Sequence, residues 1–297
     1  MTAPVLLIDT YSLFFRAHHA LPPMSTKASE PTAAIYGFSS LLLKLLREQP
    51  GAALAFALDE PTATFRHDSY EAYKAGRPAT PSALAAQFGR LNQLLAAFAV
   101  PTFRCPGFEA DDVLATLALR ARSTAQPALV VSGDRDLLQL ARGSVKVYFV
   151  GRRGKDALVY DGAQVLLRFG VPAEVLPSYV ALVGDPSDNL PGVPGIGAAT
   201  ARGLLASKQS CLDLLQDLAA VKNARTRQAL ASHSQQILET ERLARLREDA
   251  RIPAQSSSWS TPAPAAWDAL GKLFDELEFK SLHKRLDLLK ASWPAGG

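Results

Sequence analysis

The stretch VLLID at 5–9, with ALAFALD at 53–59 and ALVVSGD at 128–134, decides the fold. The apolar residues of each run are contiguous and do not alternate with polar ones, which is typical of strands buried on both faces. Helical patterns fill the intervals, at 33–48, 82–99 and 110–121. Strand–helix alternation of this kind predicts an α/β fold with a mainly parallel sheet flanked by helices, and a further strand is expected at 145–150.

Acidic residues gather where these strands end. The runs finish at Asp9, Asp59 and Asp134, and the carboxyl ends of parallel strands open into one crevice. Three denser motifs add to them: EADD at 109–112, DRD at 134–136 and DPSD at 185–188. Capping of helix N-termini explains any one motif equally well, but it does not require aspartates at strand ends. We therefore expect the carboxylates to meet in space.

Carboxylates that lie so close repel one another unless a cation neutralises them, and Mg²⁺ or Mn²⁺ prefers such hard oxygen ligands. Two ions about 4 Å apart would form the clamp used in phosphoryl hydrolysis. The hypothesis assigns Asp9, Asp59, Glu109 and Asp111 to one ion, Asp134, Asp136, Asp185 and Asp188 to the other, and Asp112 to either, directly or through water.

Composition limits the class of protein. The chain has 297 residues, 48% of them hydrophobic and 20% charged, which excludes a disordered or fibrous protein. Two cysteines and five scattered histidines give neither a disulfide framework nor zinc spacing. We expect no membrane span and no signal peptide, and hence a cytoplasmic protein. Without the nine carboxylates above, 19 acidic residues face 32 basic ones, which suits a polyanionic substrate, although a solvated mixed-charge surface is the simpler interpretation.

A basic segment follows the second strand, at 65–77. Tyr73, Lys74 and Arg77 are predicted to share one helical turn. Lys74 would place a point charge on a phosphate, Arg77 would bind one through two hydrogen bonds, and Tyr73 would stack on a base. A solvated helix with an extended lysine is the alternative.

The alternation of strand and helix patterns ends at about residue 170, and the chain beyond it is predicted to be helical. The stretch GVPGIG at 192–197 and the helix expected at 198–206 form a helix-hairpin-helix arrangement, which would bind duplex backbone without reading its sequence. A long helical stretch is expected at 220–251, a linker at 252–266 and a last helix at 267–289. The predicted regions are therefore an α/β core at 1–172, which carries the acidic site and the basic segment, a helical region at 173–251, and a linker with a C-terminal helix packing back on the core at 252–297.

Several stretches together resemble the 5′-nuclease (flap endonuclease) family, in particular the N-terminal 5′→3′ exonuclease domain of bacterial DNA polymerase I and its stand-alone relatives. They are VLLIDTYSLFFRAHHAL, IYGFSSLLLKLL, TATFRHDSYEAYKAGRPATP, GFEADDVLATLA, SGDRDLLQL and GDPSDNLPGVPGIGAATARGLL. They cover most of residues 5–206, and LEFKSLHKRL near the end is also similar. Thr10-Tyr11 after Asp9 and Glu60-Pro61 after Asp59 are not the commonest residues at these positions in the family, but neither pair replaces an expected ligand.

The resemblance implies a PIN-like 5′-nuclease core with a helical arch, acting in DNA replication and repair on 5′ ends, flaps or junctions by a two-metal mechanism that leaves 5′-phosphates. The nine carboxylates match the family's metal ligands. Tyr73, Lys74 and Arg77 match its helical arch, and Arg16 matches a basic residue near the scissile phosphate. The hairpin matches a duplex-binding motif that also holds K⁺. The implied DNA contacts are Tyr73, Arg66, Gly192, Val193, Gly195, Ile196, Gly197 and Thr200. A monomer, located at the nucleoid and acting beside a separate DNA polymerase, is expected.

Three other functions compete with this one. A non-catalytic binder of DNA structures would have no reason to keep all nine carboxylates. A PIN-like ribonuclease would share the acidic crevice but not the hairpin. A phosphatase using Asp134 and Asp136 as a nucleophile pair would leave Asp185 and Asp188 without a role.

Overall fold

In the part of the chain that the structure describes, six strands form one sheet in the order β3-β2-β1-β4-β5-β6. All neighbouring strands are parallel except β5 and β6, which confirms the predicted, mainly parallel sheet. The strands are β1 Val5–Asp9, β2 Leu54–Ala57, β3 Thr102–Phe103, β4 Ala128–Ser132, β5 Val145–Phe149 and β6 Leu158–Tyr160. The two edge strands have only two and three residues, too few to give a sequence pattern.

The computed structural model describes residues 3–76, 78–151, 157–252 and 258–294. The α-helices are α1 Thr10–Ala20, α2 Ala33–Glu48, α3 Phe65–Ser69, α4 Ser82–Ala85, α5 Phe88–Phe98, α6 Ala110–Ser123, α7 Gly162–Phe169, α8 Leu176–Val183, α9 Ala198–Leu205, α10 Cys211–Gln216, α11 Ala224–Ser232, α12 Ser234–Ala244, α13 Pro264–Glu276 and α14 Lys280–Ser292. Short 3-10 turns, among them η1 Asp136–Leu140, link some of them.

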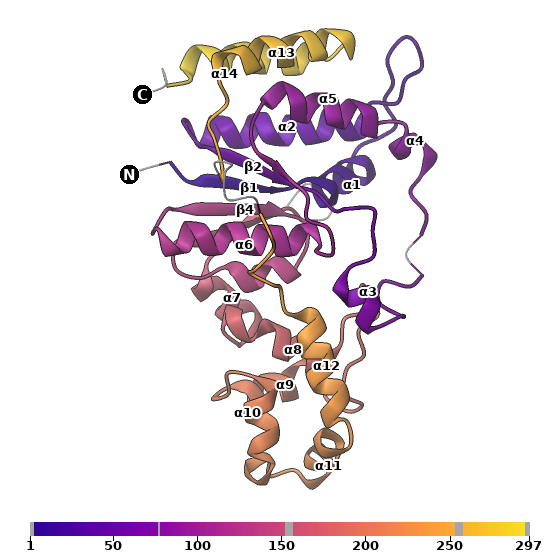
Figure 1. Cartoon of the computed structure of the whole chain (residues 1–297), viewed down its shortest axis with the longest axis vertical. Coiled ribbons are helices and arrows are strands. Elements are labelled where there is room, and N and C mark those ends of the chain that lie inside the picture. Colours follow the sequence, from indigo (N-terminus) through magenta and orange to yellow (C-terminus); the bar gives the residue numbers. More distant parts are fainter. Residues whose placement is uncertain (1–2, 77, 152–156, 253–257, 295–297) are drawn as a thin grey trace.

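Each central strand is covered on both faces. In β1, Leu6 and Ile8 join one hydrophobic cluster with α2, α5, α13 and α14, whereas Val5 and Leu7 join a second with α6 and the helices beyond it. Figure 1 shows these layers stacked along the long axis of the molecule. Burial on both faces explains why the central strands are continuous apolar runs.

Three helices predicted as single elements are interrupted. The one expected at 82–99 breaks before Gln87, whose buried side-chain oxygen accepts hydrogen bonds from the N–H groups of Ala34 and Ile35 at 3.0 and 3.1 Å. Gln87 thereby satisfies the free N-terminus of α2. The stretch expected at 220–251 contains α11 and α12, with the break at His233.

The C-terminal helix is likewise two helices. Glu278, with φ of 59°, turns the chain between α13 and α14. These two helices pack over α5 and α2 at the far end of the molecule from the helical region (Figure 1).

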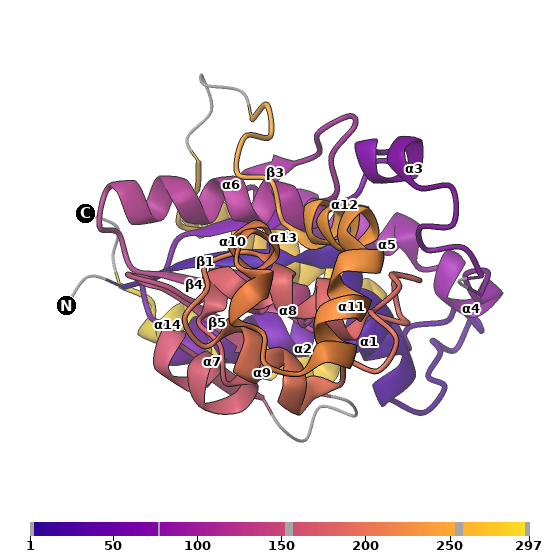
Figure 2. The same ribbon diagram turned by 90° about the horizontal axis from the view of Figure 1, so that it is seen from below.

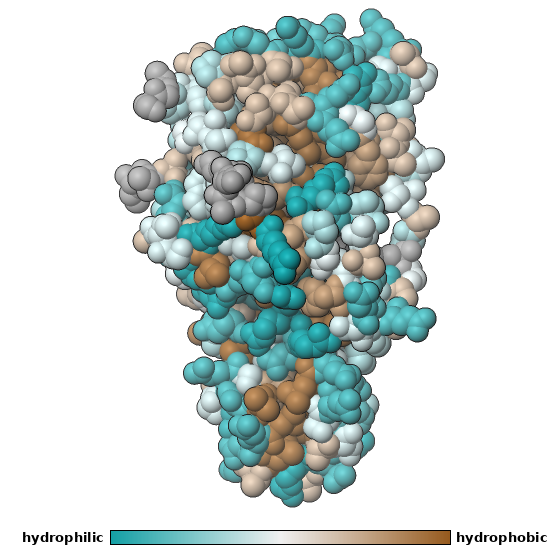
Figure 3. All heavy atoms as spheres, viewed as in Figure 1, coloured by the Kyte–Doolittle hydropathy of each residue, from teal (hydrophilic) through white to brown (hydrophobic). Residues whose placement is uncertain are grey.

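Helices α8 to α12 form a helical lobe below the sheet (Figure 1), and in the view from below they lie in front of it (Figure 2). Hydrophobic side chains gather on the front of this lobe (Figure 3). The boundaries at residues 172 and 251 stay a prediction. Within the described ranges, no single helix has the length and apolar character of a membrane span, and only one bent pair of segments, Gly162–Phe169 with Ala173–Val183, meets that test jointly.

Candidate active site

A cavity of about 760 Å³ opens at the carboxyl ends of β1, β2 and β4. Four aspartates from different parts of the chain line it: Asp9, Asp59, Asp111 and Asp134. Asp9 ends β1, Asp134 lies two residues beyond β4, and Asp111 lies in the first turn of α6. The strand-end aspartates therefore converge, as expected. The cavity lies beside β1, where the order of strands along the chain changes direction: β2 and β3 lie on one side of β1, and β4, β5 and β6 lie on the other.

Burial and, to a smaller extent, mutual repulsion raise the pKa values of two aspartates in this cavity. Burial, with smaller contributions from Asp59 and Asp134, raises the pKa of Asp9 to about 7, although Ser132 donates a hydrogen bond to its carboxylate. Burial and the charges of Asp9 and Asp134 also raise the pKa of Asp111 well above its ordinary value. Carboxylates in this state accept either protons or cations.

Three further aspartates lie beside this group. Burial and the charges of Asp134, Asp188 and Asp185 raise the pKa of Asp136 well above its ordinary value, so these side chains form one electrostatic cluster. Asp185 accepts hydrogen bonds from the backbone N–H and the hydroxyl of Ser187 at 2.8 and 2.6 Å. Among the residues that the structure describes, no three Asp, Glu, His or Cys side chains are arranged to ligate one ion directly. The division of the ligands between two ions stays a hypothesis.

Asp112, assigned to either ion directly or through water, binds protein groups in this structure, and its role as a metal ligand stays a prediction. Its carboxylate is fully buried and forms two hydrogen bonds with the guanidinium of Arg66, at 2.7 and 2.8 Å. It also accepts the backbone N–H groups of Glu109 and Arg247 at 3.1 and 2.9 Å. These four hydrogen bonds occupy the oxygen atoms that an ion would need.

Arg66 was predicted to contact DNA, but its side chain is only 1% exposed in this structure and does not present a surface to a ligand. Besides Asp112 it binds Glu109 at 3.0 Å, and it donates to the backbone carbonyls of Leu243 and Arg245 at 2.8 and 3.2 Å. Arg66 thus joins α3, the start of α6 and the chain beyond α12. We call Arg66, Glu109 and Asp112 the buried arginine cluster.

Tyr73 and Lys74 lie in turns, not in the predicted helix. Lys74 has φ of 56°, its backbone N–H binds the carbonyl of Asp188, and its ammonium lies 2.8 Å from Glu109 and 4.0 Å from Asp188. Lys74 also lines the cavity. Tyr73 is 4% exposed and its hydroxyl donates to Glu109 and Asp188, so its ring does not present a face for base stacking. Arg77 lies outside the described residues.

Arg16 borders the same cavity from α1. Its guanidinium donates to the carbonyl of Gly133 at 2.6 Å, which fixes it beside the turn that carries Asp134. A Cβ atom at position 133 would lie 2.0 Å from Nε of Arg16, so only glycine permits this approach. The structure therefore places the predicted Arg16 at the site.

The hairpin residues divide into two kinds. Val193 and Ile196 are buried, and the N–H of Val193 binds the carbonyl of Leu182 at 2.9 Å. The exposed residues are Gly195, Gly197 and Thr200, and Gly192 is half-buried. Only backbone and small side chains are thus available to a ligand at the hairpin tip.

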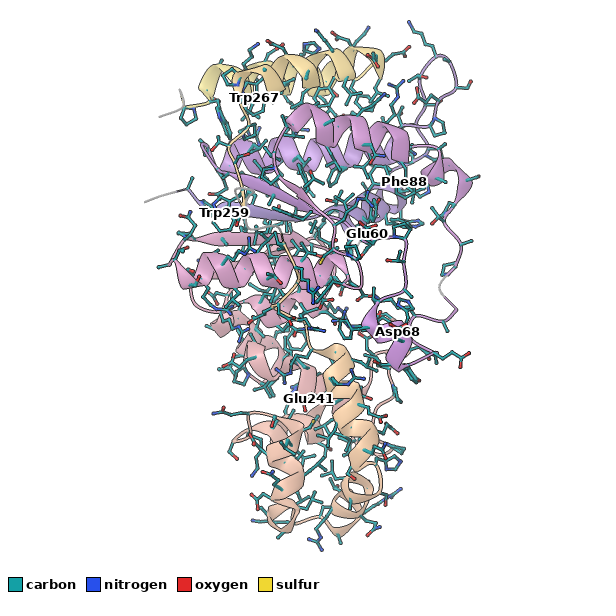
Figure 4. The ribbon with its side chains drawn as sticks, viewed as in Figure 1. Glu60, Asp68, Phe88, Glu241, Trp259 and Trp267 are labelled. Atoms are coloured by element: carbon teal, nitrogen blue, oxygen red, sulfur yellow. The ribbon has the colours of Figure 1, made fainter. Side chains whose placement is uncertain are left out.

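Aromatic residues of the cavity wall were not predicted. Tyr11, Phe15 and Phe88 line it, and the rings of Tyr11 and Phe88 meet edge to face with centroids 5.5 Å apart. Figure 4 shows Phe88 and Glu60 on the side of the molecule where the strands end, with Asp68 on α3 beyond them. Tyr11 and Phe15 are four residues apart, directly after a strand-end aspartate, and residues at that spacing lie on the same face of a helix. The sequence would have predicted this aromatic wall if a helix had been expected there.

Two family models match consecutive parts of the chain. Residues 4–170 match the 5′-3′ exonuclease N-terminal resolvase-like domain, and residues 171–266 match the 5′-3′ exonuclease C-terminal SAM fold. DNA polymerase I of Mycobacterium tuberculosis is 37% identical over 99% of this chain, and thermostable DNA polymerase I of Thermus thermophilus is 36% identical over 98%. These alignments cover 32% and 34% of the two polymerases, so the chain spans about a third of their length.

Solved structures share the fold at low identity. A T5 5′-exonuclease with bound divalent metal ions (zinc) has a TM-score of 0.64 at 20% identity, covering 96% of this chain and 99% of that one. The catalytic core of Rad2 in complex with DNA substrate has a TM-score of 0.63 at 15% identity, covering 97% and 92%. Human GEN1 in complex with Holliday junction DNA has 0.64 at 16%, covering 97% and 72%. Because the N-terminal and the C-terminal exonuclease models both match, we conclude that this chain belongs to the 5′-3′ exonuclease family.

Proposed function

We propose that the chain hydrolyses DNA phosphodiesters as a structure-specific 5′→3′ exonuclease and flap endonuclease in replication and repair, leaving 5′-phosphates. The observation that carries the proposal is one cavity in which Asp9, Asp59, Asp111 and Asp134 face the cations Lys74 and Arg16. Family membership supports the same activity. Acidic groups opposite basic ones suit a reaction at an anionic phosphate with bound cations.

The donor set fits divalent cations. It consists of carboxylate oxygens, and burial together with the charges of neighbouring aspartates raises the pKa of Asp9 and Asp111. Hard oxygen ligands of this kind favour Mg²⁺ or Mn²⁺. We propose two or more such ions, held by Asp9, Asp59, Asp111, Asp134, Asp136, Asp185 and Asp188. Glu109 joins them only after exchange of its ion pairs with Arg66 and Lys74. Bound ions would supply Lewis acidity and a water molecule of lowered pKa.

The chain's own cations act on the phosphate. We propose that Lys74 and Arg16, which both line the cavity, bind the non-bridging oxygens of the scissile phosphate and neutralise charge that develops there. The hydrogen bond of Arg16 to the carbonyl of Gly133 limits the orientations of its guanidinium, which lowers the entropic cost of that contact. Arg77 belongs to this set by its place in the sequence.

DNA binding is assigned to the hairpin. The exposed backbone of Gly195 and Gly197, with Thr200 in the helix that follows, suits contacts to phosphates that carry no sequence information. Binding is then expected to be independent of sequence and steeply dependent on salt. We propose a K⁺ ion at the carbonyls of this turn. The substrates would be DNA 5′ ends, flaps and junctions. A monomeric state, a nucleoid-associated cytoplasmic location and cooperation with a separate DNA polymerase stay predictions.

A labelled 5′-flap duplex tests the proposal with Mg²⁺, with EDTA and with Asp134→Asn. We expect cleavage only in the first case, with products that carry a 5′-phosphate. Asp268→Asn, which removes an exposed carboxylate of α13, is the matched control and should cleave normally. Equal cleavage in all reactions would contradict the metal-dependent mechanism. Binding without cleavage under every metal tested would instead favour a non-catalytic binder, and preferential cleavage of single-stranded RNA would favour a PIN-like ribonuclease.

A further inference from the structure

A second cavity, of about 290 Å³, lies between α1 and α2, and side chains from β5 and α14 complete its lining. Arg16 and Ala20, one helical turn apart on α1, line both this cavity and the catalytic one, so the two are neighbours. A water molecule takes about 30 Å³ of liquid volume, so the cavity has room for a small polar group together with several water molecules.

Two contacts in this cavity each join a cation to a hydroxyl group. The guanidinium of Arg285, on α14, donates to the hydroxyl and to the backbone carbonyl of Ser40 at 2.6 and 2.8 Å. The ammonium of Lys44 donates to the hydroxyl of Tyr148 at 3.0 Å. Ser40 and Lys44 are four residues apart on α2 and therefore lie on one face of that helix. The two contacts are thus one helical turn apart.

These contacts leave hydrogen-bond donors available. Each of the two hydroxyl groups accepts a hydrogen bond from its cation and keeps its own hydrogen, and within the described part of the chain neither one donates it to another group. The guanidinium of Arg285 has five N–H groups and donates two hydrogen bonds, both to Ser40. A cavity in which donors exceed acceptors in this way suits an oxyanion.

The charge of the cavity is positive. None of the described residues that line it is acidic. Lys44 lies 3.8 Å from Glu48, but these side chains are 42% and 41% exposed, and such a pair contributes about 1 kcal/mol or less. Among the described residues, Arg285 has no carboxylate partner, and burial, followed by the charge of Arg47, lowers its pKa. Arg285 is therefore a cation that lacks a counter-charge.

The number and kind of the donors favour phosphate over a carboxylate. A guanidinium binds a phosphate through two parallel hydrogen bonds, an ammonium adds a point charge, and the hydroxyl groups can reach the remaining oxygen atoms. A carboxylate has only two oxygen atoms to share among these donors. The aromatic rings add no stacking surface, because Lys44 lies 5.7 Å from the centre of the Tyr148 ring and Tyr36 meets Phe279 edge to face. Recognition is thus limited to the anionic group.

We propose that this cavity binds a phosphate group through Arg285, Lys44 and the hydroxyl groups of Ser40 and Tyr148. Two sources of phosphate have this chemistry: a nucleoside 5′-monophosphate, which the proposed exonuclease would release, and a backbone phosphate of bound DNA. Both sources rest on the proposed function, whereas the affinity of the cavity for phosphate does not.

Binding of inorganic phosphate is tested by calorimetric titration of the full-length protein in EDTA. Arg285→Gln should weaken binding at least about fivefold, because it removes the charge and the paired N–H groups. Lys44→Gln should weaken it at least about threefold, and because Lys44 is only partly buried this variant decides the matter if Arg285→Gln folds poorly. The matched control is Lys284→Gln, which removes an exposed charge beside Arg285 in the sequence and should bind phosphate as the unchanged protein does.

Thymidine 5′-monophosphate and a short blunt DNA duplex, measured with the same variants in EDTA, identify the source. Weaker nucleotide binding in Arg285→Gln assigns the nucleotide. Weaker duplex binding, with the log–log salt slope lowered by about 0.9 for one lost contact, assigns the backbone phosphate. Failure to cleave DNA would refute the nuclease proposal, while these titrations would still decide the cavity. Equal affinities of Arg285→Gln and Lys284→Gln for all three ligands, or acetate bound as tightly as phosphate, would overturn the inference.

Discussion

Replacement of Arg66 by methionine would remove the side chain that joins the core to the helical lobe. Methionine is apolar and of comparable length, so the main change is the loss of hydrogen bonds. Asp112 is 0% exposed and would keep only two backbone N–H partners, which leaves a buried charge without a counter-ion. Breaking a buried ion pair in this way costs about 3–5 kcal/mol. The carbonyls of Leu243 and Arg245 would also be deprived of a donor.

The expected change in melting temperature follows from chain length. With about 2.1 cal/mol/K of unfolding entropy per residue, each kcal/mol corresponds to about 1.6 °C for 297 residues. Arg66→Met should therefore lower Tm by about 5–8 °C, as measured by calorimetry in EDTA.

The matched control is Arg90→Met. Arg90 also makes several hydrogen bonds to carboxylates, with Glu30 at 2.7 and 3.0 Å and Glu276 at 2.9 Å, but these groups are partly exposed. Exposed pairs contribute about 1 kcal/mol or less, so Tm should fall by no more than about 2 °C. Equal losses in the two variants would refute the view that burial makes Arg66 important.

Three further predictions concern the site. The folded-state pKa of Asp9 is raised to about 7 from 3.8, so the folded protein without ions binds more protons than the unfolded chain between these pH values. Its Tm should therefore fall as pH rises from 5 to 8. Asp9→Asn should reduce the slope of Tm against pH, and an unchanged slope would contradict the pKa assigned to Asp9. Gly192→Ala should destabilise the fold by about 1–3 kcal/mol in urea unfolding, since its Cβ would lie 2.5 Å from the carbonyl carbon of Val183, whereas Gly197→Ala, with open space around it, should stay within about 0.5 kcal/mol. Lys74→Ala should slow single-turnover flap cleavage by about 10²-fold while duplex affinity stays within about threefold, and normal turnover would remove Lys74 from the chemistry.

The sequence predicted the parts of this molecule that follow from local pattern and sheet topology. The three buried strands and their terminal Asp9, Asp59 and Asp134 were located because continuous apolar runs identify parallel strands, and parallel strands end together. The helix at 33–48 was also correct to the residue, since its apolar face repeats without interruption.

The predictions that failed depended on distant partners. Arg66 and Tyr73 have the composition of a nucleic-acid contact, but Glu109 and Asp112, about 40 residues away, bring both side chains inward. Gln87 interrupts a helix because it caps another one at Ala34. No local pattern reveals such contacts, because each depends on how the whole chain packs.

The segment between Arg66 and Gln87 is tethered at both ends, at one end to buried carboxylates and at the other to the start of α2. Twenty residues lie between these two contacts, and Lys74, one of them, is also held beside the catalytic cavity by Asp188 and Glu109. Residues 78–81 lie outside these contacts. A change in the length of residues 78–81 is therefore expected to leave Lys74 and the acidic groups in place, so the length of this stretch can vary separately from the cavity.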